Sequence, residues 1–324
     1  MTKGYLVSEF GGPEVMVWDT LNLGALAADA VRVRVAASGI NFAETRMRAG
    51  DYSGQELPFV MGMEVAGTIE EVGEEVTGLS LGDRVLGRAR GAHAEVVDCD
   101  PDHLMLLPDN LSFVQGAAIP VGWLTAWHAL YTVGGMKAGD RILVEAVGGS
   151  VGSAALALAK QAGCWVLGTA SRDEKLSQAS SLGCDAVVNY TRESVSEQVA
   201  RLTEGQGMDI GLMTIGDATA DDLIDSMGMD GRVVMFGSTG GRDITFNLRI
   251  GILNIQLLSM SISTSPAFMT QTMSDFRTRA LPLFASGELE PVVDTVLPMS
   301  DLVRAHQMVD ERTHFGKVIL SNED

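Results

Sequence analysis

The sequence predicts an α/β fold that combines a β-rich domain with a doubly wound parallel sheet. Short strands separated by turns fill the first third of the chain, as in a compact barrel or sandwich. From residue 141 onward, apolar strands alternate with helical segments, which indicates a parallel sheet covered by helices on both faces. The length of 324 residues fits about two domains.

The β-rich part is predicted from alternation and from the turn residues between its strands. Val31, Val33 and Val35 alternate with polar or small residues, the pattern of a half-buried strand. Further strands are predicted at 64–73, 82–87 and 94–98, each bounded by turn-forming residues such as Gly, Asp or Pro.

The pattern changes near Pro120, where a helix is predicted over 121–134. Strands follow at 141–147, 165–171, 186–190, 209–215 and 232–237, with helices between them at 153–163, 173–183, 194–205 and 221–228. The last part is predicted as a helix over 268–286, a strand over 292–299, a helix with Ser300 as its N-cap, and a closing strand over 314–320.

The composition argues against several classes of function. A formal net charge of −19 disfavours nucleic acid and anionic membrane surfaces, because both are polyanions. Three cysteines without a C-x-x-C pair favour a reducing compartment and cannot form a four-thiolate zinc site. The N-terminal segment lacks the apolar core of a signal peptide, and no apolar run is long enough for a membrane span, so we expect a cytoplasmic protein.

The strand at 141–147 runs into a glycine-rich turn, V-G-G-S-V-G, and then into an Ala-rich helix. Gly149 and Gly152 stand at the second and third glycine positions of G-x-G-x-x-G, and Val147 replaces the first. Such glycines let the backbone approach a pyrophosphate and let the helix pack closely, while the helix amides bind the anion. An ordinary tight turn is the alternative, but the flanking strand and helix favour nucleotide binding.

The end of the next strand favours NADPH over NADH. NAD-binding proteins place an acidic residue there for the ribose hydroxyls, whereas positions 170–171 hold Ala and Ser. Ser171, Arg172 and Lys175 are suited to bind a 2′-phosphate, and Tyr190 after the following strand adds a hydroxyl. A solvated helix start is the alternative, because two acidic residues also lie here.

Several longer motifs are distributed along the chain. They are N-F-A-E-T-R-M-R-A-G-D-Y at 41–52, M-G-M-E-V-A-G-T-I-E-E-V-G at 61–73, G-D-R-V, W-L-T-A-W, G-G-S-V-G, F-G-S and F-G-K-V-I-L. In these the sequence resembles the zinc-independent quinone oxidoreductases of the medium-chain dehydrogenase/reductase superfamily. The resemblance implies a GroES-like barrel domain, 1–119 and 268–324, around an inserted Rossmann NADPH-binding domain, 120–267, with a cofactor cleft between them.

The motifs and the resemblance together assign the cofactor-binding residues. They are Thr125, Gly148, Gly149, Ser150, Val151, Gly152, Ser171, Arg172, Lys175, Tyr190, Gly216, Phe236, Gly237, Ser238 and Lys317. For Lys317 the alternative is a solvated residue of an edge strand. Because relatives pair through the edge of the nucleotide-domain sheet, the resemblance implies a homodimer formed by the segments at 231–237 and 257–264.

Zinc-dependent relatives hold their metal with a Cys and a His at positions where this sequence has Asn41 and Met63. Both are poor zinc ligands, and the Cys-rich structural lobe is missing, so we expect no metal. The sequence also departs from the family where the strand at 209–215 ends, because Met213 and Thr214 stand where an acidic residue is usual.

Without a metal, the expected substrate is one that delocalises its own charge, a quinone or an α,β-unsaturated carbonyl. Tyr52 is the candidate to donate a hydrogen bond or proton to that substrate, as the resemblance to enoyl thioester reductases implies, and a pocket-lining role is the alternative. Asn41 is the candidate to orient the nicotinamide or the substrate, or else stabilises a turn. The five histidines form no recognisable constellation.

Two other functions stay open at this point. An enoyl thioester reductase would need a basic entrance for coenzyme A or a carrier phosphopantetheine, which the net charge of −19 disfavours. A non-catalytic protein would keep the NADPH site and have no useful turnover.

Overall fold

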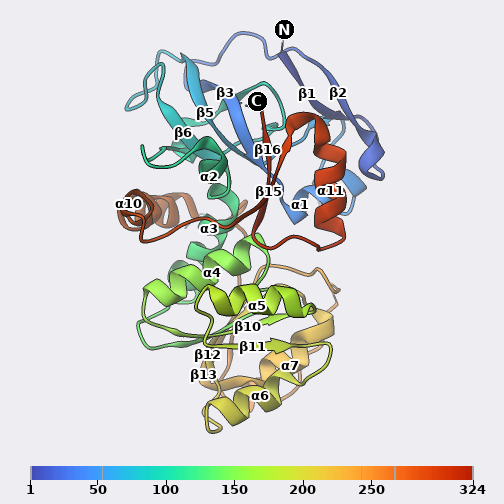
Figure 1. Cartoon of the computed structure of the whole chain (residues 1–324), viewed down its shortest axis with the longest axis vertical. Helices are drawn as coiled ribbons and strands as arrows, with labels where there is room; N and C mark the ends of the chain where they lie inside the picture. Colours follow the sequence, from blue (N-terminus) through green and yellow to red (C-terminus); the bar gives the residue numbers. More distant parts are fainter. Residues whose placement is uncertain (1, 53, 242, 266–267, 323–324) are drawn as a thin grey trace. The chain divides into compact units, whose positions relative to one another are not determined.

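The computed structural model of the chain describes residues 2–52, 54–241, 243–265 and 268–322. The chain divides into two compact units, one made of Met1–Gly122 and Arg277–Asp324 and the other of Trp123–Phe276 (Figure 1). The domain limits predicted from the sequence, 119/120 and 267/268, lie three and nine residues before these divisions.

The first unit contains two sheets, and the larger one is formed by both ends of the chain (Figure 1). The smaller sheet has the order β2-β1-β4, and the larger has the order β15-β16-β3-β5-β6-β8, with β7 also paired to β3. The strands are β1 (Thr2–Val7), β2 (Met16–Leu21), β3 (Val31–Gly39), β4 (Phe59–Val60), β5 (Glu64–Val72), β6 (Arg84–Arg88), β7 (Val96–Cys99), β8 (Leu104–Leu106), β15 (Val293–Pro298) and β16 (Lys317–Ser321).

The alternation that predicted β3 is confirmed, because Val31, Val33 and Val35 are all buried. β3 pairs antiparallel with β5, where Val33 is opposite Ile69. The closing strand β16 lies between β15, to which it is parallel, and β3, to which it is antiparallel. The core of this unit therefore joins residues from both ends of the chain.

The helices of the first unit are α1 (Phe42–Ala49), α2 (Phe113–Ala117), α10 (Leu281–Ser286) and α11 (Leu302–Asp310). The predicted N-cap is wrong by one residue, because α11 is capped at Asp301. Ser300 lies in a 3-10 turn, Met299–Asp301, that leads into the helix, and its carbonyl accepts a hydrogen bond from the Tyr5 hydroxyl at 2.9 Å. The tighter turn shifts the start of the helix toward the C-terminus.

The second unit contains a six-stranded parallel sheet with the order β11-β10-β9-β12-β13-β14. This is the doubly wound order, 3-2-1-4-5-6, in which ligands bind beyond the carboxyl ends of the strands. The strands are β9 (Arg141–Val144), β10 (Trp165–Ala170), β11 (Ala186–Asn189), β12 (Met208–Met213), β13 (Met227–Met235) and β14 (Gln256–Ser259). The predicted fold class is therefore confirmed.

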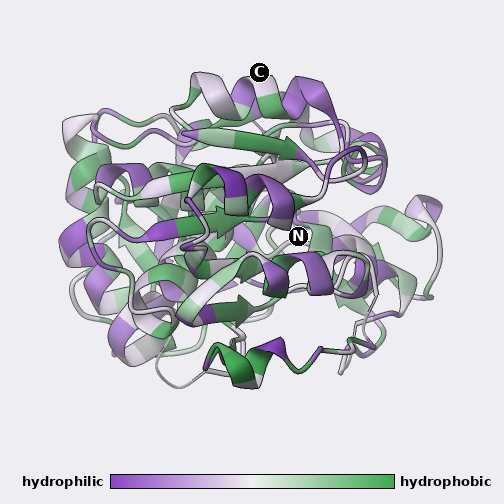
Figure 2. Ribbon diagram, turned by 90° about the horizontal axis from the view of Figure 1, so that it is seen from below, coloured by the Kyte–Doolittle hydropathy of each residue, from purple (hydrophilic) through white to green (hydrophobic). Residues whose placement is uncertain are grey.

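Helices cover both faces of this sheet, α4 and α5 on one and α6 and α7 on the other (Figure 1). Figure 2 shows hydrophobic colour along the strands and both colours along the helices, as expected of amphipathic helices. The helices are α4 (Ser150–Gln161), α5 (Asp173–Ser181), α6 (Val195–Leu202), α7 (Ala220–Asp225), α8 (Arg249–Ile252) and α9 (Met273–Asp275), and α3 (Pro120–Trp127) spans the division between the units.

Two predicted helices contain wider π turns. The helix at 121–134 continues from α3 into a π turn over His128–Val133, and the helix at 268–286 contains π turns over Phe268–Thr272 and Phe276–Ala280. Polar side chains meet between them, because His128 Nδ1 and Thr132 Oγ1 lie 2.6 and 2.8 Å from Thr272 Oγ1. Within the described residues, no helix is long and apolar enough to cross a membrane.

Candidate active site

The glycine turn between β9 and α4 has the geometry of a phosphate-binding loop. Gly149 is the N-cap of α4, and Ala146 adopts a left-handed φ of 49° to make the turn. A Cβ on Gly152 would lie 2.3 Å from the Ala146 carbonyl oxygen, so only glycine fits there. Ser150 and Val151 are half-exposed in the first turn of the helix, where the backbone amides lack carbonyl partners within the helix.

Positive side chains gather where β10 and β11 end. Ser171 and Arg172 are exposed, and Arg172 is the N-cap of α5. Lys175 lies in the first turn of α5, and Tyr190 directly follows β11; both are half-buried. The structure therefore places the residues predicted to bind a 2′-phosphate along one edge of the sheet.

Arg192, which was not among the predicted site residues, adds a further cation at this edge. Its guanidinium lies 2.5 Å from the Asp173 carboxylate, which also accepts a hydrogen bond from Asn189 at 2.6 Å. These two contacts lower the pKa of Asp173, so the carboxylate is ionised and its charge is paired with Arg192. The available signal was the position of Arg192 just after the third strand of the sheet.

Glu145, a buried carboxylate that was not predicted as a site residue, connects the ends of β9 and β12. Glu145 accepts hydrogen bonds from the amides of Thr214 and Ile215, at 2.7 and 2.9 Å, and from the Thr219 hydroxyl at 2.5 Å. Burial raises the pKa of Glu145, although these hydrogen bonds partly offset that rise. A carboxylate is thus present beside Met213, where the family's usual acidic residue is missing.

The loops after β12 and β13 come into contact beside this carboxylate. Gly216 has a φ of 89°, and a Cβ on it would lie 2.6 Å from the Gly241 carbonyl oxygen. A Cβ on Gly237 would lie 2.5 Å from the Thr214 carbonyl oxygen. Phe236 and Ser238 flank Gly237, so the structure brings these predicted residues together at the carboxyl ends of the strands. Thr125 is buried on α3, within the second unit.

In the first unit, Asn41 lies at the centre of a buried polar network. Its Nδ2 donates to Glu44 Oε1 at 2.9 Å and to Glu64 Oε1 at 2.8 Å. Its Oδ1 accepts from Lys317 Nζ at 2.7 Å, and Lys317 also forms an ion pair with Glu64. Glu64 Oε2 accepts from the Val121 amide at 2.8 Å. Lys317 is 2% exposed, so its ammonium group would have to leave these partners to reach a cofactor phosphate.

Tyr52 differs from Asn41 in its exposure. It follows α1 in a turn and is 39% exposed, whereas Asn41 is 7% exposed. Among the described residues, no hydrogen bond joins the Tyr52 hydroxyl to the Asn41 network. The two candidate catalytic residues therefore lie in different environments.

Comparison with known proteins identifies the family. A model described as an alcohol dehydrogenase GroES-like domain matches residues 27–109, and one described as a zinc-binding dehydrogenase matches residues 150–286.

The quinone oxidoreductase of Pseudomonas aeruginosa is 30% identical over 326 residues, which cover 99% of each chain. A mycobacterial structure in complex with NADPH has a TM-score of 0.91 at 30% identity, covering 98% of this chain and 99% of that one. The Escherichia coli quinone oxidoreductase in complex with NADPH has a TM-score of 0.87 at 29% identity, with the same coverage.

The chain belongs to the quinone oxidoreductase branch of the medium-chain dehydrogenase/reductase superfamily. The resemblance noted in the sequence is thereby confirmed. The similarity to quinone oxidoreductases extends over nearly the whole chain.

One expectation for this quinone oxidoreductase family member was wrong. No constellation was expected among the histidines, but His93 and His306 lie together with Glu44 in the first unit. They come from the segment before β7 and from α11, more than 200 residues apart in the chain. Sequence periodicity carries no information on such a contact.

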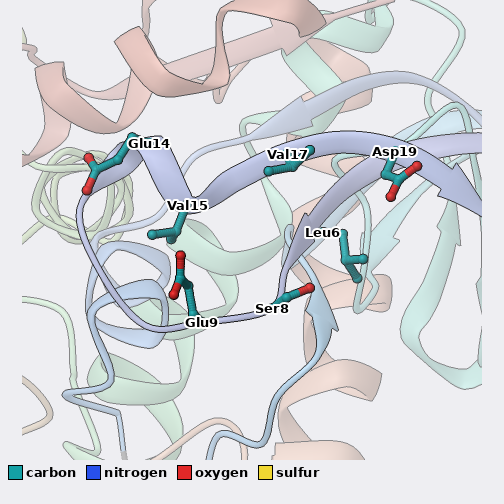
Figure 3. Close-up of a pocket in the computed structure, with 7 residues that line it drawn as sticks. All are labelled: Leu6, Ser8, Glu9, Glu14, Val15, Val17 and Asp19. Atoms are coloured by element: carbon teal, nitrogen blue, oxygen red, sulfur yellow. The ribbon is translucent and has the colours of Figure 1, made fainter.

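A hollow of about 430 Å³ lies elsewhere on this quinone oxidoreductase family member, along β1 and β2 (Figure 3). It is lined by Leu6, Ser8, Glu9, Glu14, Val15, Val17 and Asp19. None of the predicted site residues is among them, so we assign it no part in the function.

Proposed function

We propose that the chain is an NADPH-dependent oxidoreductase that transfers hydride to a quinone or an α,β-unsaturated carbonyl without zinc. The observation that carries this proposal is the glycine turn at the start of α4, where Gly152 has no room for a Cβ. Two family members of the same fold, at 29% and 30% identity, were solved with NADPH, which supports the same cofactor here.

The residues of the second unit would hold the cofactor by its charged groups. The first-turn amides of α4 would bind the pyrophosphate, because a helix N-terminus carries partial positive charge. Ser171, Arg172 and Lys175 would bind the 2′-phosphate, with Tyr190 beside them. Pairing of Asp173 with Arg192 reduces the repulsion that a phosphate would otherwise meet there. When bound, NADPH supplies the hydride.

The zinc-free chemistry is supported by the donor atoms at the family's metal position. Where zinc-dependent relatives have a Cys and a His ligand, this chain has the amide of Asn41 and the thioether of Met63. Both groups bind Zn²⁺ poorly. Asn41 already uses its amide within the network, and the neighbouring Glu64 carboxylate is neutralised by the Lys317 ammonium. These residues do not fit a zinc ion.

For the catalytic residues, we propose a division of roles. The exposed Tyr52 would donate a hydrogen bond or proton to the substrate oxygen or α-carbon. Asn41 would act as a positioning residue, since its amide is fully engaged with Glu44, Glu64 and Lys317. Quinone reduction needs less help, because solvent can protonate the phenolate that forms.

Steady-state oxidation of NADPH tests the proposal with three substrates, a simple quinone, a simple enone and an enoyl-coenzyme A thioester. Turnover of the quinone or the enone is the expected result. Turnover of the thioester alone would identify an enoyl thioester reductase and overturn the proposed substrate class. NADPH binding without oxidation by any of the three would identify a non-catalytic protein.

We also propose that the chain forms a homodimer through β14, one of the two edge strands of the parallel sheet; the predicted segment at 231–237 lies in β13, which is paired on both sides. Leu248, just before the short helix α8, and Ile252, at its end, are 81% and 69% exposed, and both lie close to β14 in the chain. Burial of such side chains between two copies would be favourable. Light scattering should give the dimer mass, and Ile252→Lys should give a monomer. Leu81→Lys, at a 71% exposed site in the first unit, is the control that should stay dimeric.

A further inference from the structure

We propose that Glu44, His93 and His306 form a binding site for one divalent transition-metal ion such as Zn²⁺. One ligand atom of each lies within 4.8 Å of the others, and all three side chains are fully buried. Two imidazoles and one carboxylate suit Zn²⁺, Co²⁺ or Ni²⁺ and disfavour Ca²⁺ and Mg²⁺, which prefer oxygen ligands. The site uses none of the residues at the position where zinc-dependent relatives hold their metal.

The hydrogen bonds of Ser38 determine which ring nitrogen of His93 carries the proton and which is free to bind a metal ion. The Ser38 hydroxyl donates to the Glu64 carbonyl oxygen at 2.8 Å, so it accepts from His93 Nδ1, also at 2.8 Å. In a neutral His93 the proton is therefore on Nδ1, and Nε2 carries a lone pair. That lone pair lies 2.6 Å from Glu44 Oε2. Two acceptor atoms at this distance need a cation between them, either a proton or a metal ion.

His306 supplies an independent observation. It is fully buried, and neither of its ring nitrogens has a hydrogen-bond partner. Buried polar atoms without partners are rare, and an ion or water is the usual explanation. His306 Nε2 lies 4.0 Å from Glu44 Oε2, which is the same oxygen that contacts His93 Nε2. The unpartnered nitrogen is therefore adjacent to the same carboxylate.

Small movements would bring the three atoms to the geometry of a bound ion. Tetrahedral bonds of about 2.0–2.2 Å place neighbouring ligand atoms roughly 3.3 Å apart. The contact between His93 and Glu44, now 2.6 Å, would lengthen by about 0.7 Å. The contact between His306 and Glu44, now 4.0 Å, would shorten by about 0.7 Å.

The residues around the three ligands orient them as the outer partners of metal ligands do. Ser38 fixes the His93 ring, and Asn41 holds the second oxygen of Glu44 at 2.9 Å. Two cations act near the cluster, and both are paired: Arg48 Nη2 lies 3.0 Å from Asp310 Oδ2, and Lys317 forms an ion pair with Glu64. The site therefore keeps the negative charge of Glu44 for a bound ion.

An ion here would stabilise the first unit rather than take part in hydride transfer. It would join α1 and α11 to the segment before β7, and no ligand is exposed to a substrate. The metal should raise the melting temperature of the chain because it binds only the folded state. It should leave the rate of NADPH oxidation by the folded chain unchanged.

The test is a titration of the chelator-stripped full chain with Zn²⁺, followed by metal analysis after dialysis. The wild type should retain about one ion per chain and show a higher melting temperature with Zn²⁺. His306→Gln should lose most of the bound ion and the rise in melting temperature. His103→Gln, at a partly exposed site of the same unit outside the cluster, should behave as the wild type. Retention of no ion by the wild type, or equal retention by His306→Gln, would overturn the proposal and leave a proton between His93 and Glu44.

A second measurement keeps the proposal testable if His306→Gln does not fold. Co²⁺ added to the wild type should give the visible absorption of a four- or five-coordinate nitrogen and oxygen site. Intense near-ultraviolet absorption from thiolate to Co²⁺ would instead place the ion on Cys99, Cys164 or Cys184, which are free and buried, and would overturn the proposal.

Discussion

The Glu145 carboxylate at the end of β9 accepts a hydrogen bond from the Thr214 amide at the end of β12, with an oxygen–nitrogen distance of 2.7 Å. The neighbouring Ile215 amide donates to the same oxygen. A side chain from one strand therefore holds the loop that follows the adjacent strand. In this way a carboxylate remains at this edge although β12 itself ends in Met213.

Glu145→Ala should destabilise the chain and weaken NADPH binding. The substitution leaves two amides without their acceptor, which costs about 1–3 kcal/mol for each group that stays buried. Denaturant unfolding and an NADPH titration measure the two effects. Glu174→Ala, on the exposed first turn of α5, is the control and should change stability little. Equal stability of the wild type and Glu145→Ala would show that the loop does not depend on this carboxylate.

Arg172→Ala and Lys175→Ala should each weaken NADPH binding by about 10–100-fold, because a charge-assisted hydrogen bond contributes roughly 1.5–3 kcal/mol. NADH binding should change little, since NADH lacks the 2′-phosphate. Titration of both cofactors against each variant gives the comparison. Arg201→Ala, near the end of α6, is the matched control. Equal losses for NADPH and NADH would place the 2′-phosphate elsewhere.

Gly152→Ala should abolish cofactor binding or prevent folding, because the new Cβ would lie 2.3 Å from the Ala146 carbonyl oxygen. Gly251→Ala provides the control, since nothing lies within 4 Å of a Cβ there and its φ is ordinary. Far-ultraviolet circular dichroism and an NADPH titration of both variants make the measurement. Normal NADPH affinity in Gly152→Ala would contradict the phosphate-loop geometry.

Tyr52→Phe should lower kcat for an enone by about 100-fold, the usual contribution of one general acid, and should affect a quinone much less. The difference arises because only the enone needs a positioned proton at carbon. Tyr5→Phe is the control, because it removes a buried hydrogen bond to the Ser300 carbonyl and should lower stability without changing kcat. The same loss for both substrates would point to a binding role for Tyr52.

The Asp222 carboxylate on α7 should make part of the stability depend on pH. Burial alone would raise its pKa, but hydrogen bonds from Ser196, Val195 and Ser194 outweigh burial and lower the pKa. A lowered folded-state pKa means that the contribution is present above about pH 4, the unfolded value, and is lost as pH falls through the folded value. Asp222→Asn should therefore cost about 1 kcal/mol at neutral pH and less at roughly pH 3.

Denaturant unfolding of Asp222→Asn and wild type at both pH values gives this comparison. Asp221→Asn, on the exposed side of the same helix, is the control and should show no such pH dependence. A difference between Asp222→Asn and wild type that is the same at both pH values would contradict the assignment to the ionised carboxylate.

Local patterns in the sequence were sufficient to predict the elements that carry a clear period or a glycine signal. The alternation at Val31, Val33 and Val35 predicted β3, and the turn at Gly149 and Gly152 predicted the start of α4. The start of α11 was missed by one residue because a 3-10 turn precedes it. Helix α1 was not predicted, since it is only eight residues long and half of them are polar.

The polar contacts of the site could not be predicted in the same way, because they join residues far apart in the chain. Lys317 and Asn41 are 276 residues apart, and Glu145 and Thr214 are 69 apart. One signal was available for Glu145: it is a charged residue directly after the apolar run Ile142–Val144, and a charged residue is rarely buried without partners. His93 and His306 carried no such signal, since isolated histidines occur in many environments.

The position of β16 between β15 and β3 has a consequence for synthesis on the ribosome. All of Trp123–Phe276 is made before Lys317–Ser321. The nucleotide-binding unit can therefore fold while the larger sheet of the first unit still lacks β16. Until those residues emerge, the end of β3 that pairs with β16, Ala37–Gly39, lacks its partner strand and is a site for aggregation or for chaperone binding. A nascent chain released early should therefore have a folded centre and an open N-terminal sheet.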